Sequence, residues 1–279
     1  MIAAASTWEL SRRSLSLERP LVMGILNVTP DSFSDGNRFF SCTAAVERAL
    51  ELEREGADII DIGGESTRPN APAVDLAQEL DRVVPVIEAL AGRLRVPISV
   101  DSYKAGVARA ACAAGAEIVN DVSGLFFDPA MAQTVAEADA GLVVMHTRGT
   151  PDHMQANTRY VDLIAEVKEY LLASLALARD AGIPASRIAI DPGIGFGKSV
   201  AGNLELIRRL SEFLPLGLPI LVGPSRKSFI GKVLGDDDRD RTFGTAATVA
   251  VSILNGASII RVHDVAVMRD VALMARALA

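Results

Sequence analysis

A short unit that recurs along the chain constrains the fold most. In this unit Gly-Ala leads into a β-branched run and then a polar residue: GADIID at 56–61, GAEIVN at 115–120 and GASIIR at 256–261. Each copy follows a helical pattern, so its glycine suits the position that closes a helix. The Val/Ile run is typical of a buried parallel strand. We therefore expect helices to alternate with parallel strands.

Variations of the unit cover the rest of the chain and predict eight strands, at 21–27, 58–62, 97–101, 117–120, 141–146, 188–191, 219–222 and 258–262. Helical patterns fill the gaps, at 43–55, 76–90, 104–114, 129–139, 163–181, 204–213, 242–255 and 265–278. Three polar residues are placed to cap helices, namely Asp75, Asn203 and Asp264.

Eight strands alternating with eight helices predict an α/β fold, a single-domain (β/α)8 TIM barrel spanning residues 21–279. Residues 1–20 form an N-terminal extension that could close the bottom of the barrel. An open, doubly wound sheet is the main alternative, because alternation alone does not prove closure.

Composition excludes several classes of protein. The net charge of -7 argues against nucleic acid as a partner, and the longest apolar runs are strand-sized, which argues against a membrane span. The N-terminus lacks a signal-peptide pattern. Cys42 and Cys112 have neither metal-ligand nor disulfide spacing, which predicts a reducing, cytoplasmic location.

In a barrel, functional groups lie at the carboxyl ends of the strands and in the loops that follow. Those positions hold polar side chains that a buried strand would avoid without partners: Asn27, Asp61, Asp101, Asn120, His146, Asp191, Lys227, Arg261 and His263. Some are compact groups that suit a flat heterocycle, namely Asp101, Asn120, Asp191 and Lys227. Others suit an anion with a divalent metal, namely Asn27, Thr67, Arg68, Arg261 and His263.

The glycine-rich stretch RIAIDPGIGFGKS at 187–199 looks at first like a phosphate-binding loop. The P-loop spacing, however, needs a glycine where this chain has Pro192. The spacing Gly193-x-Gly195-x-Gly197 is also one residue short of the dinucleotide fingerprint. Both nucleotide readings are therefore weak, and Asp191 at the strand end becomes the residue of interest.

The linked motifs resemble those of the dihydropteroate synthase family. GILNVTPDSFSDG at 24–36 and DIGGESTRP at 61–69 look like its two signature loops. The likeness continues in order through VDSYK, ND, DPGIGFGK, SRKS and RVHDV, and covers about residues 20–279. Two departures, at Asn37 and Pro224, remove no functional group.

The resemblance implies an enzyme of folate biosynthesis, a sulfonamide target, that condenses 7,8-dihydropterin-6-ylmethyl diphosphate with 4-aminobenzoate and releases diphosphate. By motif it implies that the pterin is bound by Asp101, Asn120, Asp191 and Lys227. Mg²⁺ is bound by Asn27, and diphosphate by Thr67, Arg68, Arg261 and His263 with Ser66 nearby. The aminobenzoate is surrounded by Phe33, Pro69, Phe196 and Ser228.

The implied chemistry needs no strong general base, because a neutral arylamine is already nucleophilic. The barrier lies in breaking the C–O bond, so cationic groups and Mg²⁺ stabilise the leaving diphosphate. Asp35 is a candidate to support positive charge on the pterin in an SN1-like path. The loops 28–39 and 65–73 are expected to become ordered on the diphosphate before aminobenzoate binds. A homodimer formed through late barrel helices is also implied.

Taken singly, several residues have ordinary structural explanations. His146, Arg148 and His153 are left outside the site, and Glu65 is expected to order the second loop internally. The run DDDRDR at 236–241 is expected to be a solvated loop. Three other functions compete: a corrinoid methyltransferase barrel, a non-catalytic pterin-binding paralogue and a phosphate-binding aldolase barrel. Diphosphate release that depends on aminobenzoate would separate the synthase from the methyltransferase, and ligand binding without turnover would support the paralogue. The aldolase would need a Schiff-base lysine inside a strand, and none of the predicted strands contains one.

Overall fold

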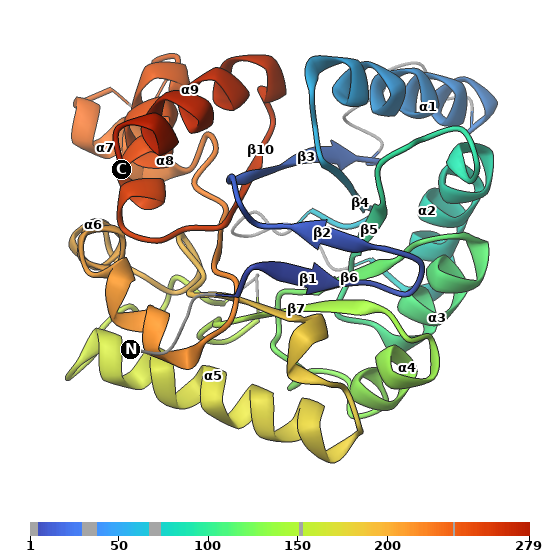
Figure 1. Ribbon diagram of the computed structural model, residues 1–279, viewed down its shortest axis with the longest axis horizontal. Coiled ribbons are helices and arrows are strands. Elements are labelled where there is room, and N and C mark those ends of the chain that lie inside the picture. The colour runs from blue at the N-terminus through green and yellow to red at the C-terminus, as the bar shows by residue number, and fades with distance from the viewer. Residues whose placement is uncertain (1–4, 30–37, 67–73, 151–152, 237) are drawn as a thin grey trace.

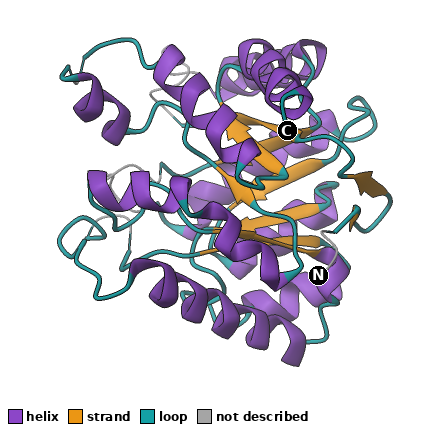
Figure 2. Ribbon diagram, turned by 60° about the vertical axis from the view of Figure 1, so that its left-hand side comes forward, coloured by secondary structure: helices purple, strands orange, loops and turns teal. Residues whose placement is uncertain are grey.

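The computed structural model describes residues 5–29, 38–66, 74–150, 153–236 and 238–279. Eight parallel strands lie at the centre, surrounded by helices (Figures 1 and 2). The strands are β3 (Leu21–Asn27), β4 (Ile59–Gly63), β5 (Ile98–Asp101), β6 (Ile118–Asp121), β7 (Gly141–Met145), β8 (Ile188–Asp191), β9 (Leu221–Val222) and β10 (Ile259–Val262). Each predicted strand is present, with ends that differ by no more than two residues.

The sheet closes into a barrel. Its strand order is β8-β7-β6-β5-β4-β3-β10-β9, with neighbours parallel throughout. A parallel bridge between Ile190 and Ile220 joins the two edge strands. The prediction of a TIM barrel is therefore confirmed, and the open doubly wound alternative is wrong.

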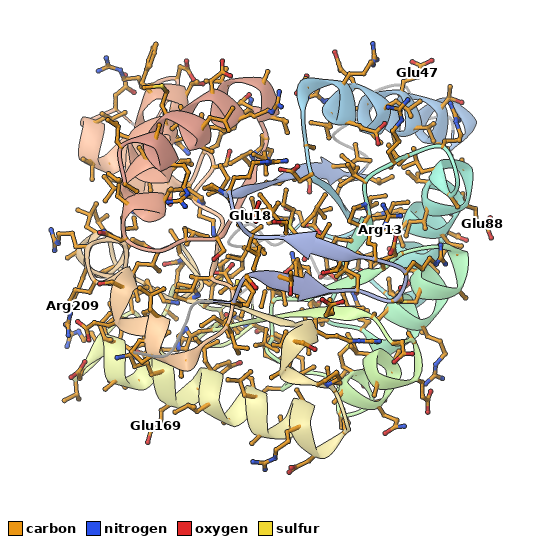
Figure 3. All side chains as sticks on the ribbon, viewed as in Figure 1. Arg13, Glu18, Glu47, Glu88, Glu169 and Arg209 are labelled. Carbon is orange, nitrogen blue, oxygen red and sulfur yellow. The ribbon has the colours of Figure 1, made fainter. Side chains whose placement is uncertain are left out.

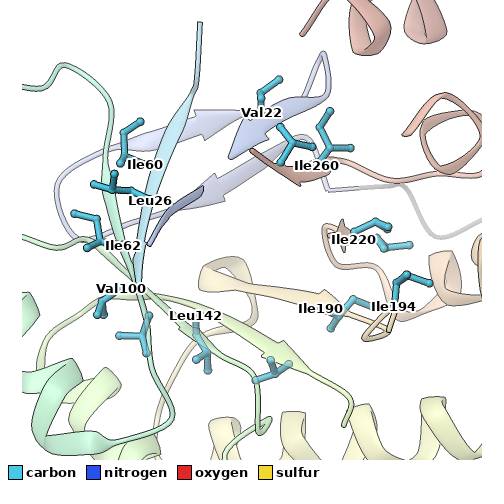
Figure 4. Close-up of a cluster of buried hydrophobic side chains, with 14 of the residues drawn as sticks. Val22, Leu26, Ile60, Ile62, Val100, Leu142, Ile190, Ile194, Ile220 and Ile260 are labelled. Carbon is cyan, nitrogen blue, oxygen red and sulfur yellow. The ribbon is translucent and has the colours of Figure 1, made fainter. Parts of the chain in front are cut away.

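Helices follow the strands and pack on the outside of the barrel. They are α1 (Arg38–Glu55), α2 (Leu76–Leu90), α3 (Ala105–Ala114), α4 (Met131–Glu137), α5 (Leu163–Asp180), α6 (Val200–Arg208), α7 (Ser228–Leu234), α8 (Thr242–Leu254) and α9 (Val265–Ala277). The main core lies between helices and strands, where outward-facing strand residues such as Val22, Ile60 and Leu142 are fully or almost fully buried (Figure 4).

A hairpin of β1 (Thr7–Glu9) and β2 (Ser14–Ser16) covers the amino ends of the barrel strands. Figure 1 shows it lying across the centre of the ring of helices. Trp8 is fully buried, and its indole N–H donates to the carbonyl oxygen of Arg187 at 2.9 Å. Trp8 and Leu10 pack against the lowest inward-facing layer of strand residues. The hairpin thus plugs the bottom of the barrel.

Three helix predictions need comment. Asp75 caps α2 as expected, accepting from the Gln78 N–H at 2.8 Å. Asn203 does not begin a helix, because α6 starts three residues earlier with Ser199 as its cap. Asp264 stands at the cap position of α9 but makes no capping hydrogen bond, because its carboxylate pairs with Arg226 instead. Helix α7 was not predicted.

The outer surface carries many charged side chains. Figure 3 shows labelled side chains such as Glu47, Glu88, Glu169 and Arg209 pointing away from the barrel. Within the described ranges, none of the helices combines the length and the apolar character that a membrane span requires. Cys42 and Cys112 are both free thiols.

Candidate active site at the carboxyl end of the barrel

The interior of the barrel changes character along the strands. Pairing register sets which residues share the inward face: Met23 lies opposite Ile59, and two residues on Ile25 lies opposite Asp61. One step further, Gly63 is paired with Asp101, and Asp101 with Asn120. Side chains alternate sides along a strand, so these residues all point inward. The inward face is therefore apolar below and polar above.

The four residues assigned to a heterocycle share one site. Asp101 and Asn120 are buried neighbours on adjacent strands, and Asp191 is buried at the end of β8. Lys227 precedes α7 and interacts electrostatically with both Asp191 and Asp101. Its ammonium donates to the carbonyl oxygen of Ile194.

Arg261 connects these residues to a further carboxylate. Its Nε donates to Asp61 Oδ2 at 2.5 Å, and a terminal nitrogen donates to Asp101 Oδ2 at 2.6 Å. Asn120 Nδ2 lies 3.2 Å from the same Asp61 oxygen. Asp61 is fully buried, and its Oδ1 is one of the few buried side-chain atoms in the described residues without a hydrogen-bond partner. Arg261, on β10, thus reaches across β3 to carboxylates on β4 and β5.

Burial changes the protonation of this cluster. It raises the pKa of Asp101 to about 7, although the Arg261 charge opposes the rise and Asp61 adds to it. Burial also raises the pKa of Asp191, against the effect of Lys227. The pKa of Lys227 is lowered to about 8 by burial, with Asp191 opposing. Two carboxylates and the lysine that interacts electrostatically with both therefore titrate closer to neutrality than usual.

The last two strand-end loops are held to each other. The hydroxyl of Ser225 lies 3.2 Å from the backbone nitrogen of His263 and 3.0 Å from its Nδ1. Beside this contact the guanidinium of Arg226 forms a fork on the Asp264 carboxylate. The loop that carries Lys227 is therefore fixed to the loop that carries His263.

A cavity of about 740 Å³ opens at this end of the barrel, within the size range of small-ligand sites. Its lining includes most of the described residues assigned to ligands, namely Asn27, Ser66, Asp101, Phe196, Lys227, Ser228, Arg261 and His263. Asp238–Arg241, expected as a solvated loop, are exposed or half-buried and also line the cavity. Met154 and Ser225 line it as well, and sequence reasoning did not single them out.

The glycine-rich loop shapes the cavity wall. Asp191 Oδ1 accepts from the Gly193 N–H at 2.7 Å, so the loop folds back onto the strand end. Gly193 has φ +74°, and a Cβ there would lie 1.9 Å from the carbonyl oxygen of His146. Only glycine fits at such a contact. Asn203, within α6, holds the next turn by accepting from Gly195 N–H at 2.6 Å.

His146 and Arg148 lie on the far side of that loop and do not line the cavity. His146 is buried, with its ring 4.8 Å from that of Tyr170. Burial and the charge of Lys198 lower its pKa to about 2. Arg148 pairs with Glu166 at 2.9 Å. These partners are consistent with structural roles for both residues.

The start of the second signature loop is anchored by the side chain of Glu65. Glu65 accepts from the Tyr103 hydroxyl at 2.8 Å and pairs with Lys104, which also contacts Glu79. The internal ordering role expected for Glu65 agrees with these contacts. Five residues assigned to ligands lie outside the described residues, namely Phe33, Asp35, Thr67, Arg68 and Pro69.

Among the described residues, no group of three or more His, Cys, Asp or Glu side chains is placed to hold a metal ion. Asn27, however, points inward at the cavity beside Gly63 and Asp101. Mg²⁺ commonly takes one or two protein oxygens and fills its octahedron with phosphate oxygens and water. A single amide oxygen therefore fits a metal that arrives with a diphosphate.

Comparison with known proteins bears directly on this site. A family model described as pterin binding enzyme matches residues 23–263. The dihydropteroate synthase of Synechocystis is 49% identical over 262 residues, which are 94% of this chain and 91% of that protein.

Solved structures agree with the sequence match. The dihydropteroate synthase of Xanthomonas albilineans, solved with 4-aminobenzoic acid, is 44% identical with a TM-score of 0.91. The match covers 99% of this chain and 98% of that one. The Yersinia pestis enzyme, solved with a sulfonamide drug complex, is 41% identical with a TM-score of 0.92 over 98% of both chains.

Proposed function

The chain belongs to the dihydropteroate synthase family, and on that premise we propose that its barrel mouth joins a 7,8-dihydropterin-6-ylmethyl diphosphate to 4-aminobenzoate. One observation carries the proposal: Asp101, Lys227 and Arg261 line a single cavity, with Asn120 buried beside Asp101 on the next strand and Asp191 buried within electrostatic reach of Lys227. This set offers partners for both a pterin and a diphosphate.

The pterin is bound by the inward-facing carboxylates. A carboxylate accepts two N–H groups from an exocyclic amine and the adjacent ring nitrogen, and such charge-assisted pairs are strong. Asp101 and Asp191 are the described candidates, and Asn120 supplies both a donor and an acceptor. Lys227 lies close enough to Asp191 to favour its ionised form and to donate to a ring carbonyl.

The diphosphate is bound by Arg261 and His263, with Ser66 nearby in the cavity lining. Arginine's fork matches phosphate oxygens in a two-point contact. Thr67 and Arg68, from the second signature loop, complete the proposed set. Asn27 would hold Mg²⁺, which would neutralise charge on the leaving group.

The reaction breaks the C–O bond between the pterin methylene and diphosphate, and both electrons leave with the diphosphate. A C–N bond forms to the arylamine, whose nitrogen then loses a proton. Fixed positive groups at the leaving oxygen lower this barrier because they need no reorganisation during the reaction. We assign that work to Arg68, Arg261 and His263, and the stabilisation of an SN1-like pterin cation to Asp35.

Aminobenzoate binds against Phe196 and Ser228, and we assign Phe33 and Pro69 to the same ligand. Phe196 lines the cavity, and Lys227 Nζ lies 4.3 Å from the centre of its ring. Ser228 is the first residue of α7, where backbone N–H groups have no helical partner and can meet a carboxylate. The complex of the Xanthomonas relative with 4-aminobenzoic acid supports this ligand.

We further propose a homodimer formed through α8 and α9, in a cytoplasmic protein. These packed helices expose apolar side chains, including Val251, Leu254, Met274 and Leu278. An exposed apolar patch of this kind is typical of an interface. Met274→Glu should shift the mass measured by sedimentation toward the monomer, whereas Val161→Glu, at an exposed residue outside this patch, should not.

The test of the proposed activity is diphosphate release by the purified chain. Release should require both the dihydropterin diphosphate and 4-aminobenzoate, and should fall sharply in Asp191→Asn. Binding of the pterin without any release, under conditions where both substrates saturate, would instead indicate a non-catalytic binding protein.

A further inference from the structure

The Gly-Lys-Ser ending of the glycine-rich stretch has a structural use that the proposed reaction does not account for. Ser199 caps α6, accepting from the Gly202 N–H at 3.1 Å. Lys198 turns away from solvent and is only 3% exposed. A buried lysine needs partners for its three N–H groups.

Lys198 finds these partners behind the loop. Its Nζ donates to the carbonyl oxygen of Phe196 at 2.9 Å and lies 2.8 Å from His146 Nδ1. The carbonyl oxygen of His146 is a third acceptor, at 3.5 Å. Three acceptors match the three donors of an ammonium group. When Lys198 is protonated, Nδ1 is the acceptor in this pair and the imidazole proton lies on Nε2.

Each partner of Lys198 is tied to a ligand-binding residue. Phe196 lines the cavity with its ring, and Lys198 holds its backbone from the other side. The backbone N–H of His146 donates to the carbonyl oxygen of Asp191 at 3.0 Å. Gly193, between these residues, has no room for a side chain, since a Cβ there would lie 1.9 Å from the His146 carbonyl oxygen, with Lys198 Nζ 3.1 Å away.

The glycine-rich loop is thus held by hydrogen bonds on two sides. On the cavity side, Lys227 donates to the carbonyl oxygen of Ile194. On the far side, Lys198 holds Phe196 and His146. Two lysines therefore flank the Asp191 carboxylate, and both interact with it electrostatically, although burial lowers the pKa of each. A residue needed only for packing would not need a polar end here, because an apolar side chain fills a buried space without needing hydrogen-bond partners.

We propose that Lys198 is a positioning residue, which holds the glycine-rich loop through Phe196 and His146 so that Asp191 meets the pterin and Phe196 meets the aminobenzoate. The proposal rests on the proposed function for the identity of the two ligands. It assigns to Lys198 no contact with substrate and no step of the reaction.

The test compares Lys198→Met, which keeps the length but removes all donors, with Lys198→Gln, which restores two of them. Lys168→Met is the control, since Lys168 is a half-buried lysine that pairs with Glu212 but lies on α5, outside the glycine-rich loop. For each variant the Kd of 6-hydroxymethylpterin is measured by calorimetry, and kcat and KM for aminobenzoate by diphosphate release. The ¹⁵N–¹H amide shifts of Gly195 are recorded without ligand.

Lys198→Met should weaken pterin binding about tenfold, the scale of one lost hydrogen bond. It should raise the KM for aminobenzoate more than it lowers kcat, and move the Gly195 amide signal. Lys198→Gln should recover part of each effect, and Lys168→Met should show none of them.

Two results would overturn the proposal. One is a Lys198→Met enzyme whose pterin Kd and Gly195 signal stay at wild-type values. The other is equal losses in Lys168→Met, which would mean a general structural effect. If the wild-type chain releases no diphosphate, the proposed function fails. The pterin Kd and the Gly195 signal of the variants would still test the positioning role of Lys198.

Discussion

The two ends of the barrel are built from the same strands and differ completely in chemistry. At the amino end, the inward-facing residues are apolar and packed under Trp8: Met23, Ile59, Ile118, Val143, Ala189, Leu221 and Ile259. Two residues further along four of these strands, the same face carries Asp61, Asn120, Asp191 and Arg261. On these strands, the apolar residue at the stabilising end and the polar residue at the functional end are therefore consecutive inward-facing residues, two positions apart.

The two ends of the barrel require different kinds of side chain. The lower layer needs only apolar volume, so its contribution is to stability and its loss creates a cavity. The upper layer buries charges that water would otherwise solvate, at a cost that only mutual pairing or a ligand offsets. This contrast predicts that mutations at the two ends affect different measurements.

The largest expected effect is at the lower end. Trp8→Ala removes a fully buried indole and leaves the carbonyl oxygen of Arg187 without its donor. The free energy of unfolding should fall by about 3–5 kcal/mol in denaturant titration. Trp8→Phe keeps most of the volume and should lose less. A change below 1 kcal/mol in Trp8→Ala would show that the hairpin does not stabilise the barrel.

At the upper end, Asp191→Asn should affect binding rather than folding. An amide offers one acceptor oxygen where the pterin presents two N–H donors, and a hydrogen bond to a charged group is worth about 1.5–3 kcal/mol. The Kd of a pterin, measured by calorimetry, should rise accordingly. Unchanged affinity would remove Asp191 from the site.

A smaller effect concerns pH. In the wild type, kcat/KM for the dihydropterin diphosphate should rise as the pH increases through about 7, because Asp101 ionises, and fall above about 8, because Lys227 loses its proton. This ratio reports the free enzyme. Arg261 lowers the pKa of both groups. Arg261→Gln should therefore move both limbs of the profile to higher pH.

Arg209→Gln is the control for this profile, since Arg209 lies on the outer surface and pairs with Glu205 and Glu212. Its limbs should stay where they are in the wild type. If the limbs of Arg261→Gln also stay in place, Arg261 does not couple the pterin and diphosphate halves of the site.

Much of this comparison could be read from the sequence. The strands were predictable because a buried parallel strand leaves a continuous Val/Ile run, and the rim because polar residues end those runs. The fold was confirmed, whereas the assignment of individual rim residues to ligands stays a prediction.

What the sequence could not show depends on contacts between distant residues. Arg261 pairs with Asp61 across 200 positions and with Asp101 across 160. A residue expected to bind diphosphate therefore also contacts Asp101, which was expected to bind the pterin. Lys198 follows a glycine pattern typical of phosphate loops, and only the position of His146 explains why it turns inward. The sequence predicts Asn203 as a helix cap, but Ser199 is the cap of α6. Asn203 lies inside the helix, and its side chain accepts a hydrogen bond from the Gly195 N–H. Helix α7 is seven residues long, too short for a periodic pattern.

The most direct test of the difference between the two ends is the stabilisation that a pterin adds to folding. A ligand at one hundred times its Kd should raise the free energy of unfolding by about 2.7 kcal/mol. Trp8→Ala should start from a lower stability and still gain the full increment. Asp191→Asn should start near the wild-type stability and gain little at the same pterin concentration. A full increment in Asp191→Asn, or none in Trp8→Ala, would contradict the separation of function and stability along these strands.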